Sequence, residues 1–262
     1  MIAALEPDAS LEEPFIRVRG LDKSFGGRTV FAGFDLDLPP GKMTTVFGPN
    51  GCGKSTLINM LSGLLPFDAG DIEIGGRDLR SARIGYVFQN YRESLFPWSR
   101  ARENVEYPLR VRGVSRTKRR ERVDELLDAF KIALDLNRYT YELSGGQQQL
   151  VAILRALVAD PDVLFLDEPF SALDYEMTLY MRDKLQTVFL ETGLTTVLVS
   201  HDLEEAVYLA DRILLLSKPP TRVVELIAYD TPRPRTTEVM ADARFVAVKQ
   251  HALELFRAEM QR

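Results

Sequence analysis

The sequence is poor in cysteine, tryptophan and histidine. Its 262 residues include one cysteine, one tryptophan and two histidines. The single cysteine, Cys52, excludes an internal disulfide and fits a reducing compartment. A chain of this length is enough for one large α/β domain, or for a core domain with an inserted subdomain.

Long hydrophobic runs and an excess of positive charge are also absent. The longest apolar runs, such as Leu150–Leu154 and Ala206–Ala210, fall far short of the roughly 18–20 residues that cross a bilayer. The net charge is −5, so charge alone gives no reason to expect a nucleic-acid partner.

The first 14 residues carry four acidic side chains and no basic one. They lack the positively charged start of a secretory signal, and we expect residues 1–14 to form a short mobile lead-in. Together with the lack of a membrane-spanning run, this predicts a cytoplasmic protein that would serve a membrane only from its side.

Short β-branched and aromatic runs alternate with longer helix-like segments along the chain. This alternation is typical of an α/β fold with a largely parallel sheet. Helix-like segments begin at Lys54, Gly146, Asp174 and Asp202. The expected strands are Phe15–Arg19, Phe31–Leu38, Met43–Phe47, Ile72–Ile74, Ile84–Phe88, Val163–Leu166, Thr195–Ser200, Arg212–Leu216 and Arg222–Ile227.

The pattern changes in the middle of the chain, where apolar residues fall at helical spacing between Glu121 and Leu134. We interpret residues 90–159 as a helical subdomain inserted into a core of residues 15–89 and 160–229. The basic stretch Arg110–Arg122 is either a solvated helix face and turn, which we favour, or a nucleic-acid patch. Residues 230–262 are expected to form a Pro/Arg-rich turn and an amphipathic helix near Asp242–Met260.

A phosphate-binding motif follows the strand-like run Met43–Phe47 and precedes a helical segment. The motif G-x-x-x-x-G-K-[ST] is matched by Gly48, Pro49, Asn50, Gly51, Cys52, Gly53, Lys54, Ser55 and Thr56. Glycines allow backbone N–H groups to turn towards a polyanion, and the following helix adds its positive end. The pattern predicts that a nucleotide is bound here, with Lys54 on the outer phosphates and the hydroxyl of Ser55 on Mg²⁺.

Cys52 lies inside this loop. A cysteine at a helix N-terminus favours the thiolate, which is the reactive form. A catalytic cysteine also needs a nearby base, and the sequence identifies none. We therefore interpret Cys52 as a residue that fits the loop and takes no part in chemistry.

Two acidic residues, Asp167 and Glu168, end the apolar run Val163–Leu166. Strand ends at the carboxyl edge of a parallel sheet are where ligands bind. Asp167 is predicted to hold Mg²⁺ through water, and Glu168 to polarise the attacking water. The alternative is a pair of solvated acids at a strand end.

The two histidines differ in their expected roles. His201 follows a run that should neighbour the Asp167 strand, so its ring could reach a γ-phosphate. His251 falls in the last helix and is expected to be a surface or packing residue.

A phosphate loop with two acids is compatible with a kinase, a small GTPase or a helicase. The string Leu143-Ser144-Gly145-Gly146-Gln147 distinguishes between them, because it resembles the signature sequence of ABC ATPases. Ser144, Gly145, Gly146 and Gln147 would open a helix as a second anion site, used on ATP that another copy of the chain holds. A plain capping box, with Ser144 and Gln147, is also consistent with the string.

Further positions are similar to the ABC pattern between Phe15 and Ile227. The resemblance implies a P-loop NTPase core of RecA type, an antiparallel β subdomain and an inserted helical subdomain. It places Phe25 against the adenine, and Gln89 where Mg²⁺ and the attacking water are sensed. His201 would be the switch histidine, and the segment Ser171-Ala172-Leu173-Asp174 would cross a dimer interface.

A finer resemblance is to importers of nitrate, sulfonates and taurine. It is carried by Leu95-Phe96-Pro97-Trp98, Ala101–Val105, Leu216–Pro220 and Pro232–Arg235. Phe96 and Trp98 would line a groove for a helix of a membrane subunit. Alternatively, they pack between the helical subdomain and the core.

This resemblance implies an ATP-hydrolysing homodimer on the inner face of the cell membrane. Its partners would be membrane-spanning permease subunits and, indirectly, a periplasmic or extracellular solute-binding protein, and no nucleic acid is expected. Two alternatives stay open, a soluble ABC ATPase that acts on nucleoprotein and an exporter-type ABC ATPase.

Overall fold

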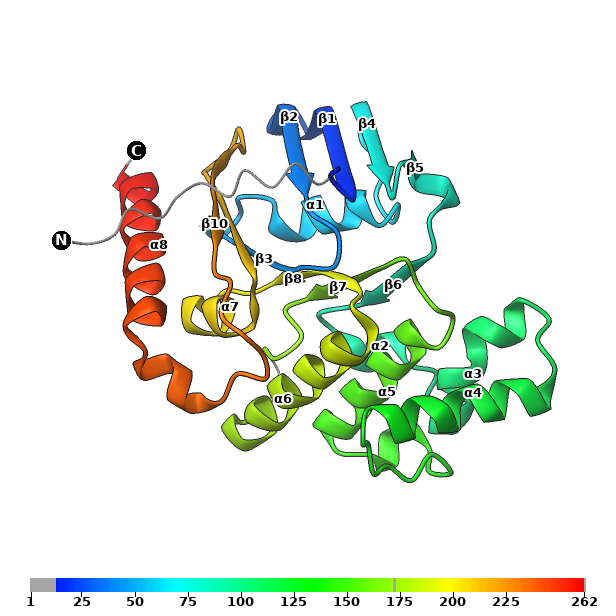
Figure 1. The fold of residues 1–262 in the computed structure, drawn as a ribbon. Coiled ribbons are helices and arrows are strands. Elements are labelled where there is room, and N and C mark those ends of the chain that lie inside the picture. Colours follow the sequence, from blue (N-terminus) through cyan, green and yellow to red (C-terminus); the bar gives the residue numbers. More distant parts are fainter. Residues whose placement is uncertain (1–12, 172, 262) are drawn as a thin grey trace.

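The computed structural model describes residues 13–171 and 173–261, and it contains two β-sheets with helices packed around them (Figure 1). The four-stranded sheet is antiparallel, with the order β2 (Arg28–Leu38), β1 (Ile16–Phe25), β4 (Ala69–Ile74) and β5 (Arg77–Asp78). The six-stranded sheet has the order β10 (Val223–Ala228), β9 (Arg212–Leu216), β3 (Met43–Phe47), β8 (Thr195–Val199), β7 (Val163–Asp167) and β6 (Ile84–Val87). It is parallel except for β10, which runs antiparallel to β9.

The central strands β3, β8 and β7 are buried along their whole length, because helices or strands cover both faces of the six-stranded sheet. In β7, Val163 and Phe165 contribute to one hydrophobic core, and Leu164 and Leu166 to the other. The first core holds α1 (Lys54–Leu61) and the four-stranded sheet. The second core holds α5 (Gly145–Leu157) and α6 (Tyr175–Thr192), so α1 and α5 lie on opposite faces of the sheet (Figure 1).

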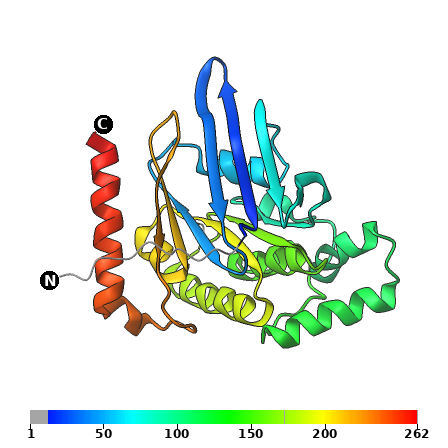
Figure 2. The same ribbon diagram turned by 45° about the horizontal axis from the view of Figure 1, so that its top comes forward.

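Residues between β6 and β7 form a helical region at one end of the molecule (Figure 2). It contains α2 (Tyr91–Ser94), α3 (Ala101–Val111), α4 (Arg116–Ala129) and α5. The buried Asn104 holds the segment before α3, because its Oδ1 accepts from the N–H of Phe96 at 2.8 Å and its Nδ2 donates to the carbonyl of Phe96 at 3.1 Å. The rest of this region packs through leucine and valine side chains against α5.

The chain after β8 forms α7 (Leu203–Leu209), β9 and β10, and it ends in α8 (Ala243–Gln261). Arg235, from the Pro/Arg-rich turn, is buried rather than solvated. Its guanidinium donates to the carbonyls of Tyr208 at 2.9 Å and Ala210 at 2.7 Å, and burial lowers its pKa to about 10. These bonds attach the turn to the end of α7. No helix in the described part of the chain is both long and apolar enough to span a bilayer.

The predicted α/β class with a largely parallel sheet is confirmed, while several boundaries differ. The strand expected over Phe15–Arg19 continues to Phe25, because the buried Lys23 pairs with Asp68 at 3.0 Å and so remains compatible with a sheet. The helix expected from Gly146 begins at Gly145. The expected lead-in falls almost wholly outside the described residues, and so does Ala172 of the predicted interface loop. The short elements η1 (Leu79–Ser81), η2 (Thr140–Glu142), η3 (Thr237–Ala241), α2 and β5 were not predicted.

Candidate active site

The phosphate loop connects β3 to α1, as its motif requires. Gly53 is the N-cap of α1 and has φ of 97°, a left-handed conformation that favours glycine. A Cβ at this position would also lie 2.8 Å from Cγ1 of Val30. The Nζ of Lys54 donates to the carbonyls of Gly48 at 2.9 Å and Pro49 at 3.1 Å. The lysine therefore lies across its own loop, with its charge held at the loop carbonyls.

The thiol of Cys52 points away from the surface of the loop. Its side chain is fully buried in the apolar core beside α1, and its Sγ would lie 3.2 Å from a Cβ at Gly48. Burial raises the pKa of Cys52, and the nearby charge of Lys54 offsets this only in part. Only the backbone of Cys52 can face a ligand, so the thiol is a packing group.

Ser55 and Asp167 come together from two elements, α1 and β7. The hydroxyl of Ser55 donates to Oδ1 of Asp167 at 3.1 Å. Burial raises the pKa of Asp167, although its contact with Ser55 opposes this. A hydroxyl and a carboxylate at this distance are oxygen ligands of the kind that Mg²⁺ accepts from protein, with phosphates and water as the others. The residues present therefore fit the predicted ion.

Glu168 lies where two further predicted residues meet. Gln89, just after β6, donates from Nε2 to its Oε2 at 3.0 Å, and Nδ1 of His201 lies 3.3 Å from the same oxygen. The backbone of Glu168 has φ of 44°, which is uncommon for a residue with a side chain. No described residue donates to Oε1, so this oxygen is available to a water molecule.

The position of His201 follows from the turn between β8 and α7. The N–H of Asp202 donates to Oγ of Ser200 at 3.0 Å, and Oδ1 of Asp202 accepts from the N–H groups of Glu204 and Glu205, which caps α7. The buried carboxylate of Glu205 accepts from the Ser200 hydroxyl at 2.5 Å and pairs with Arg182. This network fixes the turn, and it leaves the His201 ring largely exposed.

A cleft of about 580 Å³ joins the phosphate loop to the end of the chain. Residues Gly48–Gly51 and His201 line it, together with residues that the sequence analysis did not place at the phosphate loop, among them Arg28, Lys218, Phe256 and Met260. Nζ of Lys218 donates to the carbonyl of Met260 at 2.8 Å, and the rings of Phe47 and Phe256 lie 5.3 Å apart. Helical spacing predicted α8, but nothing local in the sequence indicated which surface it covers.

The signature segment, Leu143–Gln147, is at the start of α5 and outside the cleft at the phosphate loop. Ser144 caps α5, accepting at Oγ from the N–H of Gln147, while Oε1 of Gln147 accepts from the N–H of Ser144 at 3.0 Å. This is the capping box that the sequence predicted. Gly146 packs against Met177 so closely that a Cβ would lie 2.1 Å from its sulfur. None of these residues lines the cleft at the phosphate loop.

The remaining predicted residues are in three places. Phe25, 47% exposed, lies at the β1–β2 turn, with Nζ of Lys23 at 5.2 Å from its ring centre, and it does not line the cleft. Ser171 donates from Oγ to the carbonyl of Glu168 at 3.0 Å, and Asp174 caps α6 by accepting from the N–H of Met177. Leu173 packs against the core beneath the helical region.

Comparison with known proteins agrees with this geometry. The ABC transporter family profile matches residues 31–171. The chain is 36% identical to the taurine import ATP-binding protein TauB of Escherichia coli K12 over 91% of this chain and 95% of that protein. The same figures hold for the TauB protein of Shigella flexneri.

Solved structures give the same result. The dimeric structure of the bacterial ABC transporter cassette MJ0796 has a TM-score of 0.71 and 30% identity, covering 83% of this chain and 100% of that one. The structure of cbiO1 from Clostridium perfringens, part of the ABC transporter complex cbiONQ, has a TM-score of 0.74 and 26% identity, covering 95% and 99%.

A phosphate loop, two strand-end acids and a capped signature helix in this fold define an ATP-hydrolysing cassette. The chain belongs to the ABC transporter family, and it is an ATP-binding and ATP-hydrolysing subunit of that family.

Proposed function

We propose that this chain energises the import of a small sulfonate-type solute through a separate permease. The observation that carries the proposal is the similarity to a taurine import ATP-binding protein over nearly the full length of both chains. The segment Leu95–Trp98, which resembles importers of nitrate, sulfonates and taurine, supports the same class. Hydrolysis of ATP to ADP and phosphate would supply the free energy.

ATP would bind with its phosphates in the cradle of residues Gly48–Thr56. The backbone N–H groups at the start of α1 and the charge of Lys54 would receive the β- and γ-phosphates. Lys54 would release its loop carbonyls to do so. Arg28 and Lys218, in the same cleft, would add positive charge beside the nucleotide, and Phe25 would face the adenine after the β1–β2 turn moves towards it.

Mg²⁺ would be held by the Ser55 hydroxyl, by Asp167 and by Gln89, directly or through water. When bound, the ion neutralises charge on the phosphate oxygens. Because burial raises the pKa of Asp167, this carboxylate is well suited to a site where a cation compensates its charge.

Glu168 would polarise the attacking water with Oε1, the oxygen that described residues leave without a donor. Gln89 and His201 both contact Oε2, so they orient the carboxylate and leave the other oxygen towards the phosphate. The exposed His201 ring would turn towards the γ-phosphate. These three residues form the proposed catalytic group.

Two copies of the chain would be needed for a complete site. Ser144, Gly145, Gly146 and Gln147 open α5 away from the phosphate loop of their own chain, so we propose that they contact ATP held by the partner copy. Ser171, Leu173 and Asp174 would lie at the interface between copies. A solved relative, MJ0796, is dimeric, which supports this arrangement.

We propose that residues 90–159 form a subdomain inserted in a core of residues 15–89 and 160–229, with residues 230–262 as a C-terminal extension. The permease would dock on this inserted helical region. Trp98 is 75% exposed, and the rings of Phe96 and Trp98 lie 5.5 Å apart. An exposed indole that packs at a tilt on a half-buried ring suits a partner helix. This docking would place the subunit on the inner face of the membrane, below a permease served by an external solute-binding protein.

Recovery of the native complex tests the proposal. Tagged Glu168→Gln protein is incubated with ATP and detergent-solubilised native membranes, and bound proteins are identified by mass spectrometry, with Lys54→Ala as the matched control. Recovery of a polytopic permease, followed by taurine-stimulated ATP hydrolysis of the reconstituted complex, is expected. Recovery of ribosomal or DNA-bound partners alone would contradict it and favour a soluble ABC ATPase.

A further inference from the structure

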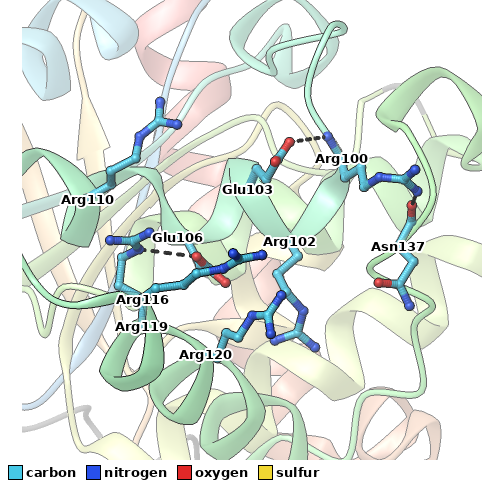
Figure 3. Close-up of a pocket in the computed structure, with 9 residues that line it drawn as sticks. All are labelled: Arg100, Arg102, Glu103, Glu106, Arg110, Arg116, Arg119, Arg120 and Asn137. Atoms are coloured by element: carbon cyan, nitrogen blue, oxygen red, sulfur yellow. Dashed lines mark hydrogen bonds and ion pairs between the residues drawn. The ribbon is translucent and has the colours of Figure 1, made fainter.

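A second polar cleft lies between α3 and α4, away from the phosphate loop, and six arginines line it (Figure 3). Its volume is about 530 Å³. The figure shows guanidinium groups from both helices entering the space between them. The lining residues are Arg100, Arg102, Glu103, Glu106, Arg110, Arg116, Arg119, Arg120 and Asn137.

A largely buried ion pair forms the floor of this cleft. Glu106 and Arg119 are both largely buried, and Oε2 of Glu106 accepts from Nε of Arg119 at 3.2 Å. Nη1 of Arg119 also donates to the carbonyl of Val114 at 2.6 Å. This pair joins α3 to α4 and fixes the spacing of the other arginines above it.

The carboxylates in and beside the cleft satisfy only part of its positive charge. Arg119 pairs with Glu106, and Arg102 pairs with Asp124 at 2.8 Å. Among the described residues, Arg116 and Arg120 have no hydrogen-bond or ion-pair partner. They are four residues apart on the same face of α4, where like charges repel.

Arg102 adds a second, independent observation. Its Nη1 is buried and has no hydrogen-bond partner, although Nη2 of the same guanidinium is paired with Asp124. A buried donor without an acceptor is unfavourable, and in native proteins such a group usually has a ligand or water as its partner. Arg102 lines the cleft, so an anion oxygen or a water molecule admitted beside it would supply the missing acceptor.

The lining also indicates what kind of anion fits. Guanidinium groups from several directions match the oxygens of phosphate, and more than one phosphate is needed to match the excess of charge. Among the described residues no aromatic ring lines the cleft, so a nucleobase would have only guanidinium planes on which to stack. These features favour a phosphate-rich group over a nucleotide or a nucleic-acid strand.

We propose that the cleft between α3 and α4 is a second anion site, which binds a phosphate-bearing group through Arg102, Arg116 and Arg120. The group is either a soluble oligophosphate or the headgroup of an anionic lipid. It would join α3 and α4, and α3 packs directly on the signature helix α5. The two clefts share no lining residue, so the anion site can be tested apart from ATP binding.

Binding measurements with two probes test the proposal. All proteins in the comparison carry Lys54→Ala, so that the phosphate loop contributes as little as possible to the measured binding of the probes. The cleft variant Arg116→Gln with Arg120→Gln is compared with Arg80→Gln plus Arg257→Gln, which removes the same charge from exposed positions elsewhere. Inorganic pyrophosphate is titrated by calorimetry, and capture by phosphatidylglycerol vesicles is compared with capture by phosphatidylcholine vesicles.

We expect the cleft variant to bind at least one probe about tenfold more weakly than the control variant. Loss confined to pyrophosphate identifies a soluble ligand, and loss confined to anionic vesicles identifies a headgroup. Equal binding of both probes by the two variants would overturn the proposal. Cleft-dependent binding of duplex DNA without any effect on either probe would also overturn it, in favour of a nucleic-acid surface.

Discussion

The phosphate loop and the signature segment precede helices on opposite faces of the six-stranded sheet, α1 and α5, and the two segments differ in what they contact. Around the phosphate loop, polar side chains from distant elements bond to each other: Ser55 to Asp167, and Gln89 and His201 to Glu168. At the signature segment, Ser144 and Gln147 bond only within their own helix end.

This difference divides the site into two halves. In the assembled half, around the phosphate loop, the fold brings side chains from distant elements into contact. In the presented half, at the signature segment, the side-chain hydrogen bonds of Ser144 and Gln147 stay within one helix end. The carboxylates to which we assign the chemistry, Asp167 and Glu168, are held by neighbours in the same chain, so their geometry is set before ATP binds. The start of α5 offers N–H groups and a positive helix end, and none of its residues lines the cleft at the phosphate loop. A second copy is the simplest way to bring the two halves together.

The largest expected effect is on the assembled half. Glu168→Gln keeps the side chain's shape and hydrogen bonds but removes the charge that polarises water. We expect ATP turnover to fall by a factor of about 10² to 10⁴, with ATP affinity retained. Phosphate release and equilibrium ATP binding measure the two quantities. Turnover close to wild type would remove Glu168 from the catalytic role.

If the two halves of a site come from different chains, a mixture of two inactive variants should recover activity. Lys54→Ala disables the phosphate loop, and Ser144→Arg blocks the signature segment, so each variant alone should be inactive. A mixed dimer contains one loop and one signature segment that are both intact and face each other. An equal mixture should recover roughly a quarter of wild-type turnover, since about half of the dimers are mixed and each has one of two sites. A mixture no more active than its components would show that the halves do not meet across copies.

The sequence predicted that the side chains of the assembled half lie near one another, because they follow buried strands. The four side chains lie at the ends of parallel strands or within two residues of them, and such strand ends meet at one edge: Asp167, Glu168, Gln89 and His201. The sequence analysis did not find Lys218, Phe256 and Met260 beside the loop, because α8 reaches that surface only through tertiary packing. It also interpreted Arg110–Arg122 as a solvated face, since a local pattern does not show that α3 supplies arginines opposite α4.

A smaller effect is expected in the scaffold of the assembled half. Asp162, just before β7, accepts from the guanidinium of Arg83 at 2.7 Å and pairs with Arg77 at 3.0 Å. The hydrogen bond from Arg83 is the main reason that the pKa of Asp162 lies below its ordinary value of 3.8. Asp162→Asn should lower the free energy of unfolding by about 1–2 kcal/mol at pH 7, since both arginines are half exposed.

The sign of the pH dependence follows from the direction of that shift. A carboxyl group with a lowered pKa stabilises the fold fully above its ordinary value, and this contribution is lost as the pH falls through the folded-state pKa. The difference between wild type and Asp162→Asn, measured by urea unfolding, should therefore be constant near neutral pH and shrink below pH 3.8. A difference that is independent of pH would assign the effect to packing.

The smallest expected effect concerns Gln147, which caps α5 and is also proposed to contact ATP of the partner copy. Gln147→Ala removes the acceptor for the N–H of Ser144, so the free energy of unfolding should fall by about 0.5–1 kcal/mol. Gln147→Glu keeps an acceptor at the same place and adds a negative charge that a helix start favours, so its stability should match wild type.

Turnover should order these variants differently if Gln147 also faces ATP of the partner copy. The carboxylate of Gln147→Glu would repel a γ-phosphate, whereas the alanine variant only loses a contact. We therefore expect the more stable glutamate variant to hydrolyse ATP more slowly than the alanine variant. Turnover that follows stability across both variants would instead mean that Gln147 acts only as a helix cap, and the anion site would then depend on Ser144 and the N–H groups of α5 alone.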